Sequence, residues 1–577
     1  MINRRRFLQA SAGAAAFLAT SRRAYPFAQS PLGVTKFLAT LPALGPGGAN
    51  NLGNYISVLS SNKTKYPGTD YYEIVAKPFA QQVHPAIPTT KFWGYADAGT
   101  LDSRYLGGVI VAKRGTPVKV KITNLLPPAH ILPVDSTLVD PTMAAETGGR
   151  QDRICIHLHG GLVNWDDDGG PFHWFSNAKN PGGFVHGSSF INKGDVAGSA
   201  IYDYPNDQSA RLVWYHDHAY SLTRTNAYAG IASAYLITDD AETLLVKGGL
   251  LPDIGGAFPL GIPLVVQDKT FWDGASGHDP SYPAVVPAGA ATGSLWYPHV
   301  YEGAPKSSLP PMTLPPTCSS NARWEQEGGS PPPVSTVPEF FSDIILVNGA
   351  PYPVLPVDRR RYRFRLLNGS QARFYNLQLY IADSSADGIT LKNSGELDNN
   401  GNPLLVPKNA SGPRMIQIGT EGGFLPAPAV LNNPARPIGY KVTANPNDPT
   451  NGNVNRYTLL MAPAERHDVI VDFRDVAAGS EVILYNDAPA PFPGGDIRND
   501  YYTGRPDLSC IGGAPPNKAG AGPDTRIIMK FKVGSKTVPE FSFDETLQAL
   551  QVALPITFWT TQPPTWIEPD TRPKPKP

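Results

Sequence analysis

Short stretches of alternating apolar and polar residues constrain the fold of this chain more than any other feature of its sequence. In VKVKIT, Val118, Val120 and Ile122 fall on one side of an extended backbone, and Lys119 and Lys121 fall on the other. An alternation with a period of two is typical of a β-strand that buries one face. The segment therefore predicts a strand packed against a core on one side only.

The same pattern returns in the second half of the chain. In RRRYRFRLLNGS, residues 359–370, aromatic and aliphatic residues alternate with arginines, and ERHDVIVDFRD and EVILYND continue the pattern. After the N-terminal region, no helical periodicity longer than about three turns is convincing. The 60 prolines and 56 glycines suit many short strands joined by turns. We therefore predict an all-β fold of tandem Greek-key β-sandwich domains.

The length of 577 residues is too great for one hydrophobic core and predicts at least two domains. We expect an N-terminal signal over residues 1–30, a first domain over 31–240 and a second over 241–540. A proline-rich, weakly patterned stretch at about 259–338 reads as an insertion in the second domain. Residues 541–577 lose the strand pattern and are predicted to form an irregular, solvated tail.

The charge balance and the N-terminus bear on partners and location. The 49 basic and 49 acidic residues give no overall field that would attract nucleic acid or an anionic membrane. The N-terminus combines an Arg4-Arg5 pair, Phe7-Leu8 and a small apolar run from Ala10 to Thr20. That run is shorter than the roughly 20 residues of a membrane span. We expect a twin-arginine signal, export to the periplasm or the exterior, and no membrane span after its removal.

Two histidine pairs carry the chemistry of the sequence. His157 and His159 lie in RICIHLHGG, and His216 and His218 lie in RLVWYHDHAY. Residues i and i+2 of a strand project to the same side with Cα atoms about 6.6 Å apart. Each pair can therefore hold one metal ion or serve two neighbouring ions. Asp217 projects to the opposite face, which favours a structural role.

Burying two uncoordinated imidazoles on one face is costly unless each finds a partner. Neutral imidazole suits copper, zinc, iron and nickel. A zinc hydrolase of the HxHxDH type would need an Asp-His pair soon after His159, and Gly160, Gly161 and Leu162 follow instead. The two pairs together therefore predict a metal site of another kind. Trp214 shares the histidine side and is expected to be part of the core beside it.

At these residues the sequence resembles a known family. HLHGGLVNWDDDGG and WYHDHAYSLTRTNAYAGIASAYLI are similar to the first two copper-binding motifs of multicopper oxidases, in the bacterial branch of spore-coat laccase, bilirubin oxidase and phenoxazinone synthase. DIILVNGAPYP, RRYRFRLLNGSQARFYNL, MIQIGTEGGFLP and LLMAPAERHDVIVDF follow in the family's order. The resemblance runs from about residue 35 to 535 and implies cupredoxin-like domains that bind copper.

The resemblance also implies a reaction and roles for single residues. Family members oxidise phenols, bilirubin-like pigments or metal ions by one electron at a time and reduce dioxygen to water at a three-copper cluster. By motif position, His157 would bind the lone copper of that cluster, and His159, His216 and His218 would bind the coupled pair. Asp168 matches an acid that relays protons near the cluster. Its alternative reading is a plain acidic turn before Gly169.

The sequence departs from the family in its last third. Neither HPxHxH nor HCHxxxHxxxM occurs, His467 is the last histidine, and none of Cys155, Cys318 and Cys510 has a histidine neighbour. A blue copper site needs a cysteine thiolate with two histidines. The chain therefore offers half of the cluster ligands and no blue copper site. We expect weak copper binding or none, and no laccase activity, from this chain alone. Cys318 and Cys510 could form at most one disulfide.

Three explanations stay open at this point. The chain is truncated or frame-shifted before a third cupredoxin domain, or a separate polypeptide carries that domain. Alternatively, the chain is an inactive or partner-dependent two-domain module that binds copper. An absent domain would also leave an exposed apolar face on its neighbours, which favours association.

Overall fold

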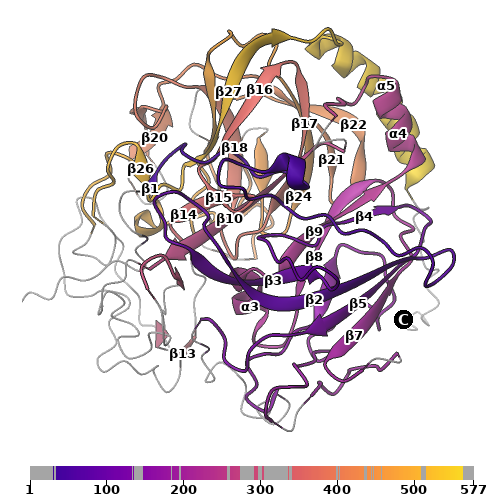
Figure 1. The fold of residues 1–577 in the computed structure, drawn as a ribbon. Coiled ribbons are helices and arrows are strands. Elements are labelled where there is room, and N and C mark those ends of the chain that lie inside the picture. The colour runs from indigo at the N-terminus through magenta and orange to yellow at the C-terminus, as the bar shows by residue number, and fades with distance from the viewer. Residues whose placement is uncertain are drawn as a thin grey trace, which may run out of the picture.

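The computed structural model describes Ser30 and residues 34–132, 134, 147–182, 185–193, 196–255, 260–272, 291–296, 302–303, 335–336, 341–397, 401, 403–433, 438–443, 445, 447–455, 458–508 and 515–562. Most of the regular structure in these residues is β-strand, so the all-β prediction is confirmed. Figure 1 shows two strand-rich units, with the earlier part of the chain below and the later part above.

The first unit is a sandwich of two four-stranded sheets. The first sheet has the order β3 (Thr90–Asp97), β2 (Asp70–Gln81), β5 (Val118–Asn124) and β7 (Ser199–Tyr204). The second has the order β4 (Ile110–Lys113), β9 (Ala232–Thr238), β8 (Arg211–Asp217) and β6 (Ile156–His159). The core includes Ile74, Ile122, Leu158 and Val213. A short helix, α3 (Thr223–Ala229), links β8 to β9.

The alternation that predicted a strand at residues 118–123 is present in β5. Val118, Val120 and Ile122 are buried, whereas Lys119 and Lys121 are only partly buried. β5 pairs with β2 in parallel and with β7 antiparallel. The strand thus packs one face on the sandwich core, as its sequence predicts.

The second unit contains an eight-stranded and a five-stranded sheet. The larger sheet has the order β15 (Ala350–Pro351), β14 (Ile344–Val347), β10 (Ile262–Phe271), β17 (Arg361–Asn368), β24 (Arg466–Asp472), β21 (Met415–Thr420) and β22 (Gly423–Leu431), with β11 (Leu295–Trp296) paired to β10. The smaller sheet has the order β16 (Val354–Arg359), β27 (Ile527–Thr537), β25 (Glu481–Asn486), β18 (Tyr375–Ile381) and β23 (Leu459–Met461). Their facing side chains, such as Phe364, Leu379 and Phe531, fill one core.

Small elements complete the described structure. Three two-stranded sheets pair β1 (Val34–Thr35) with β26 (Ala521–Gly522), β12 (Glu302–Gly303) with β13 (Ser335–Thr336), and β19 (Leu391–Leu397) with β20 (Pro403–Pro407). Two 3-10 turns occupy Pro46–Gly48 and Ile497–Asn499. The pairing of β1 with β26 places the start of the predicted first domain on the second unit. The backbone of Leu41 continues this contact by donating to Val354 O at 2.9 Å.

The prediction of an insertion at about 259–338 is wrong for its first residues, which form a strand of the larger sheet. Strand β10, Ile262–Phe271, is buried along its whole length and lies between β14 and β17 in the larger sheet. Because both faces of this strand are covered, its sequence does not alternate and gave no strand signal. Most of the remaining predicted insertion, including Cys318, lies outside the described residues, as does Cys510.

The predicted irregular tail is wrong for residues 543–561, which form helix α5 (Phe543–Thr561). Ser542 caps the helix by accepting from the backbone of Glu545, whose side chain accepts from the backbone of Ser542 in return. Leu550 and Leu554 are buried, but apolar residues also occur on the exposed side of α5. That distribution hides the helical period in the sequence. Residues 563–577 lie outside the described part of the chain.

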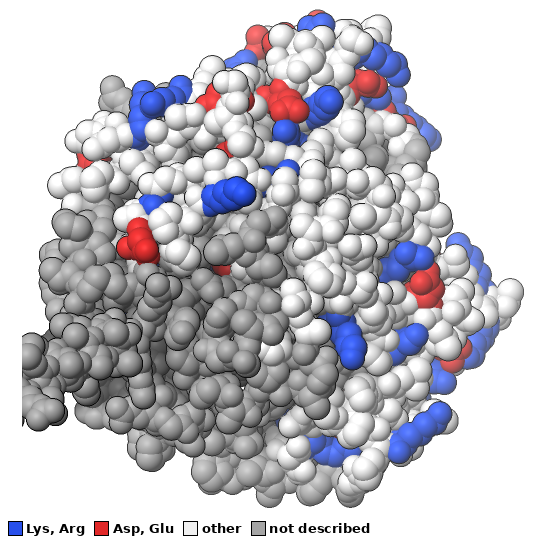
Figure 2. Space-filling model, turned by 60° about the vertical axis from the view of Figure 1, so that its left-hand side comes forward, with Lys and Arg blue, Asp and Glu red and all other residues white. Residues whose placement is uncertain are grey.

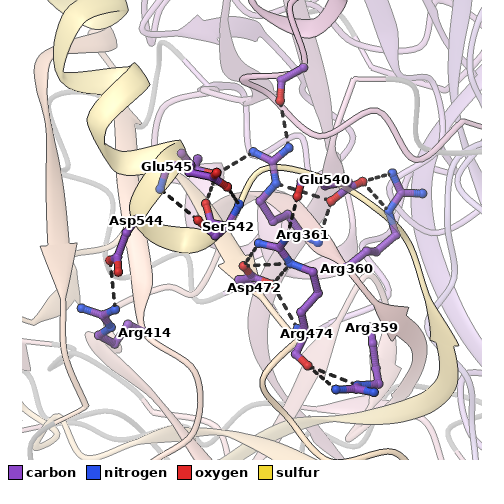
Figure 3. Close-up of polar contacts among 12 residues, drawn as sticks. Arg359, Arg360, Arg361, Arg414, Asp472, Arg474, Glu540, Ser542, Asp544 and Glu545 are labelled. Carbon is purple, nitrogen blue, oxygen red and sulfur yellow. Dashed lines mark hydrogen bonds and ion pairs between the residues drawn. The ribbon is translucent and has the colours of Figure 1, made fainter.

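Polar contacts fix the start of α5 on the second unit (Figure 3). Glu540 accepts from Arg360 Nε at 3.0 Å and from the backbone N of Arg361 at 3.0 Å. The Arg361 guanidinium also donates to Thr546 in the first turn of the helix, at 2.9 Å. Beside α5 lies α4 (Asp240–Lys247), whose N-cap residue Asp239 accepts from the backbone of Glu242. These two helices cover the arginine face of β17.

Figure 2 shows one side of the molecular surface, on which basic and acidic side chains are interspersed over the described residues. Among the described residues, no helix combines the length and the apolar character that a membrane crossing requires.

Candidate metal centre

The four histidines of the two pairs meet where β6 and β8 run side by side. These strands are antiparallel, with His157 opposite His216 and His159 opposite Trp214. His218 follows the end of β8, and its backbone N donates to Cys155 O at 2.8 Å. Because alternate residues share a face, the pairing brings both histidine pairs to the same side of the sheet.

The imidazole rings are close enough to share metal ions. One ring nitrogen from each of His157, His159 and His216 falls in a group whose members lie within 4.8 Å of one another. The His157 and His218 ring centres are 4.9 Å apart, and those of His216 and His218 are 6.0 Å apart. The sequence prediction that these four residues project together agrees with this geometry.

Backbone carbonyl groups orient two of the rings. His157 Nδ1 donates to Asp168 O at 2.6 Å, and His216 Nδ1 donates to Asp217 O at 2.7 Å. Each bond places the proton on Nδ1 and leaves Nε2 with a free lone pair. His216 Nε2 lies 3.2 Å from His159 Nδ1 inside the cluster. The backbone therefore holds two donors in the form that binds a metal.

The electrostatics of the cluster favour neutral imidazoles. Burial lowers the pKa of His216 to about 3 and that of His159 to about 4. Burial also lowers the pKa of His218, and the proximity of His157 adds to this effect. The rings of His159, His216 and His218 are thus neutral near pH 7 and need not lose a proton before they bind a metal.

Two neighbouring carboxylates of the acidic run, Asp167 and Asp168, lie in different environments. Asp167 is buried, and its carboxylate accepts from Lys193 at 2.6 Å and from the backbone of Asp203 at 2.8 Å. The Asp168 side chain is 51% exposed, with Oδ1 3.4 Å from His157 Nδ1. The structure therefore brings Asp168, which the sequence singled out, to the edge of the histidine cluster.

Residues beside the ligands pack as the sequence suggested. The Asp217 carboxylate is fully buried on the far side of β8 and accepts from the backbone of Cys155 and Ala219 and from Asn226. Burial raises the pKa of Asp217 to about 7. The Trp214 ring stacks on His216 with ring centres 4.2 Å apart and belongs to the hydrophobic core. Both residues support the site without pointing a donor into it.

Two features of the site were missed from the sequence. Gly169 has a φ of 73°, and a Cβ there would overlap the carbonyl oxygen of Ile156 in β6. The acidic turn can therefore close on β6 only with glycine at this position. Arg466, from β24 of the second unit, packs against Gly160 just after His159. The Gly169-Gly170 pair after the acidic run was a sequence signal for the tight turn. No local sequence pattern indicated that Arg466 packs against Gly160.

Comparison with known proteins agrees with the motifs. No family model matches the sequence. The chain is 31% identical to a laccase from Bacillus subtilis over 427 residues, which make up 74% of this chain and 58% of the laccase. The chain belongs to the multicopper oxidase family. The resemblance predicted from the two histidine motifs is thereby confirmed, as is the tandem cupredoxin-like fold.

Other relatives of this multicopper oxidase chain match over a similar region. A laccase from Haloferax volcanii is 31% identical over 429 residues, covering 73% of this chain and 52% of the relative. Multicopper oxidase LPR1 homolog 1 from Oryza sativa is 29% identical over 425 residues, covering 72% and 51%. Among solved structures, McoA multicopper oxidase from Aquifex aeolicus aligns with a TM-score of 0.46 at 20% identity, over 88% of this chain and 68% of that one. The chain thus spans only 51–58% of these three sequence relatives.

The donor set fits copper, the metal that this family implies. Imidazole nitrogen is a good copper ligand, and here several imidazoles converge. Nδ1 of His218 is buried and has no hydrogen-bond partner among the described residues. A buried donor or acceptor that lacks a partner costs free energy, and a bound metal would remove this cost.

Proposed function

We propose that this chain supplies the oxygen-reducing half of a copper oxidase that takes single electrons from a small donor and reduces dioxygen to water. The convergence of nitrogen donors from His157, His159 and His216 within 4.8 Å carries this proposal. Its relatives named laccases support the reaction class. Phenols, pigments and metal ions are the candidate donors, and dioxygen is the acceptor.

Four side chains of this chain would hold copper. By motif position, His157 would bind one copper, and His159, His216 and His218 would bind a neighbouring pair. When bound, copper supplies one-electron chemistry at dioxygen. Burial keeps the rings of His159, His216 and His218 neutral. The carbonyl groups of Asp168 and Asp217 fix the orientation of the His157 and His216 rings.

Asp168 is proposed to pass protons to the site. Reduction of dioxygen to water consumes protons, and the ligand rings lie in a mostly buried cluster. The Asp168 carboxylate is half exposed yet close to His157, so it can exchange protons with solvent and deliver them inward. Its backbone carbonyl meanwhile holds the ring of His157. The two roles use different atoms of one residue.

Electron entry is proposed to need ligands from outside residues 1–577. Burial raises the pKa of Cys155, and its neighbours Ile154 and Ile156 are apolar, so this thiol is not a copper-binding thiolate. No cysteine in the sequence adjoins a histidine. We infer that further polypeptide, continuous with this chain or separate from it, supplies the blue copper and the missing cluster ligands.

We further propose export through the twin-arginine route to the periplasm or the exterior. The Arg4-Arg5 pair and the short apolar run behind it support this location. Replacing Arg4 and Arg5 together by lysine should leave the protein in the cytoplasm of the expressing cell. Unchanged export of that variant would argue against the route.

The test of the oxidase proposal uses the chain loaded with copper. We expect copper to bind without a strong blue band, and no dioxygen uptake with a phenolic donor from this chain alone. Dioxygen uptake should appear when polypeptide carrying the missing ligands is added, and His157→Ala should abolish it. A strong blue band from this chain alone, or uptake that survives His157→Ala, would contradict the proposal.

A further inference from the structure

A small cavity lies where the first unit meets the second, and none of the four clustered histidines lines it. Its volume is about 10 Å³, close to the space that a single water-sized particle needs. The first unit contributes residues 210–212 at the start of β8. The second contributes Arg365 of β17, residues 466–468 of β24, and Gly419, Thr420 and Gly423 around the β21–β22 turn. Both units are therefore needed to enclose the space.

Three of the lining side chains are buried arginines. Arg365 is 1% exposed, Arg466 4% and Arg211 8%. Nε and Nη1 of Arg365 are buried and have no hydrogen-bond partner among the described residues. A buried guanidinium nitrogen without an acceptor is costly, because it has lost its water and gained nothing in return.

Among the described residues, only Arg365 of these three arginines forms an ion pair with a carboxylate, that of Glu242. Glu242 Oε1 accepts from both Arg363 and Arg365, and Asp468 is engaged by Arg363. Within the described part of the chain, the guanidinium of neither Arg211 nor Arg466 forms an ion pair within 4 Å. The two guanidinium groups donate instead to neutral groups: Arg211 to Ser209 Oγ and Arg466 to Ala464 O. The backbone N of Arg466 donates to Glu421 Oε2 at 3.4 Å, and the buried Asp239 lies close enough to Arg211 to favour its charged form. The residues that line the cavity thus include three arginines and one carboxylate, that of Asp468.

Other lining and nearby groups offset the arginine charge only in part. Burial lowers the pKa of His467, so that ring is neutral, and its Nδ1 already lies 2.7 Å from Gln417 Nε2. Burial lowers the pKa of Arg466, and the negative charges of Glu421 and Glu465, which attract its guanidinium, offset part of this shift. Glu421 is exposed and the Glu465 side chain is 42% exposed, so solvent screens both charges. Burial and the proximity of Arg466 lower the pKa of Arg211 to about 10, and the buried Asp239 offsets only part of this effect.

We propose that this cavity binds one small monovalent anion of the size of chloride. An anion offers acceptor capacity to Arg365, Arg211 and Arg466 at once and neutralises their excess charge. A water molecule would fill the space, but it carries no net charge and accepts fewer hydrogen bonds. Oxyanions such as sulfate are too large for the cavity.

The anion has a defined structural effect. It joins the start of β8, the strand that carries His216, to β21 and β24 of the second unit. Arg466, which lines the cavity, also packs against Gly160 next to His159. Occupancy therefore stabilises the junction of the two units beside the histidine cluster, and the folded chain gains stability as the anion binds.

Thermal unfolding of the full, metal-free chain tests the proposal. We expect the melting temperature to rise saturably, by about 2 °C or more, as sodium bromide replaces sodium gluconate at constant ionic strength. Arg365→Met should lose this bromide-dependent rise. Arg474→Met removes a different largely buried arginine, paired with Asp472, and should keep it. Equal melting temperatures in the two salts would overturn the proposal.

Diffraction provides a second measurement that does not depend on a variant that folds. Crystals of the unsubstituted chain grown in bromide should show an anomalous peak in the cavity beside Arg365. Density for water only, with no anomalous signal there, would overturn the proposal even if bromide stabilised the protein by another route.

Discussion

His159 Nδ1 lies 3.2 Å from His216 Nε2, although the two residues are 57 positions apart and belong to different strands. The antiparallel register of β6 and β8 creates this contact, because it sets His157 opposite His216. The metal centre is thus a property of strand pairing, and any change that shifts β6 against β8 should weaken it.

Gly169 gives the sharpest test of that dependence. Replacing it by alanine places a Cβ against the carbonyl oxygen of Ile156 at a φ of 73°. We expect Gly169→Ala to lower the free energy of unfolding by about 2 kcal/mol or more and to weaken copper binding. Gly170→Ala is the matched control, since a Cβ there meets nothing within 4 Å. Urea unfolding of both variants checks this, and equal losses would contradict it.

The variant Asp168→Asn should distinguish the orientation of a ligand ring from the delivery of protons. His157 is held by the backbone carbonyl of Asp168, which Asp168→Asn retains. We expect this variant to keep its copper affinity within about twofold, a difference below ~0.5 kcal/mol. Dioxygen uptake by the completed enzyme should fall by about 100-fold or more, the usual contribution of a positioned acid or base. Loss of copper from Asp168→Asn would show instead that the carboxylate supports the ligands.

Stability should depend on pH through the buried histidine His130. Its Nδ1 accepts from the backbone of Leu132 and its Nε2 donates to Asn226, while burial lowers its pKa to about 4. Because the folded state binds the proton less readily than the unfolded state, stability is full above about pH 6.5 and falls toward pH 4. The loss from this residue is at most about 3 kcal/mol.

His130→Gln isolates that contribution. Urea unfolding of the metal-free protein at several pH values between 7 and 4.5 should show a smaller fall for the variant than for the unsubstituted chain. The comparison is between slopes, so a lower stability of the variant at pH 7 does not affect it. Parallel slopes would rule out His130 as a source of the pH dependence.

The contacts in Figure 3 predict that Glu540 fixes helix α5. Its side chain is 10% exposed and accepts from Arg360 and from the backbone of Arg361. Glu540→Gln should lower the free energy of unfolding by about 2–3 kcal/mol, because it leaves buried arginine charge unpaired. Asp544→Asn, at a site 77% exposed and 3.6 Å from Arg414, should cost less than about 0.5 kcal/mol. Equal effects in urea unfolding would contradict this assignment.

The sequence predicted what depends on local alternation and missed what depends on distant packing. The common face of His157 and His159 follows from strand geometry alone. The position of His157 opposite His216 depends on the pairing of β6 with β8, which are separated in the chain by β7 and its flanking segments, and no local pattern encodes it. Alternation also put Arg361, Arg363 and Arg365 on one face, but all three are buried and contact Glu242 of α4 or Thr546 of α5. Strand β10 and helix α5 were missed because neither shows a one-sided apolar pattern.

The central claim, that these four imidazoles form a copper site, is tested most directly by diffraction at the copper absorption edge. Crystals of the full chain grown with copper should show anomalous density among the rings of His157, His159, His216 and His218. The joint variant His159→Ala with His216→Ala should lose this density, whereas His186→Ala, which changes an exposed histidine outside the cluster, should keep it. Copper found only at surface positions, with none between these rings, would contradict the account.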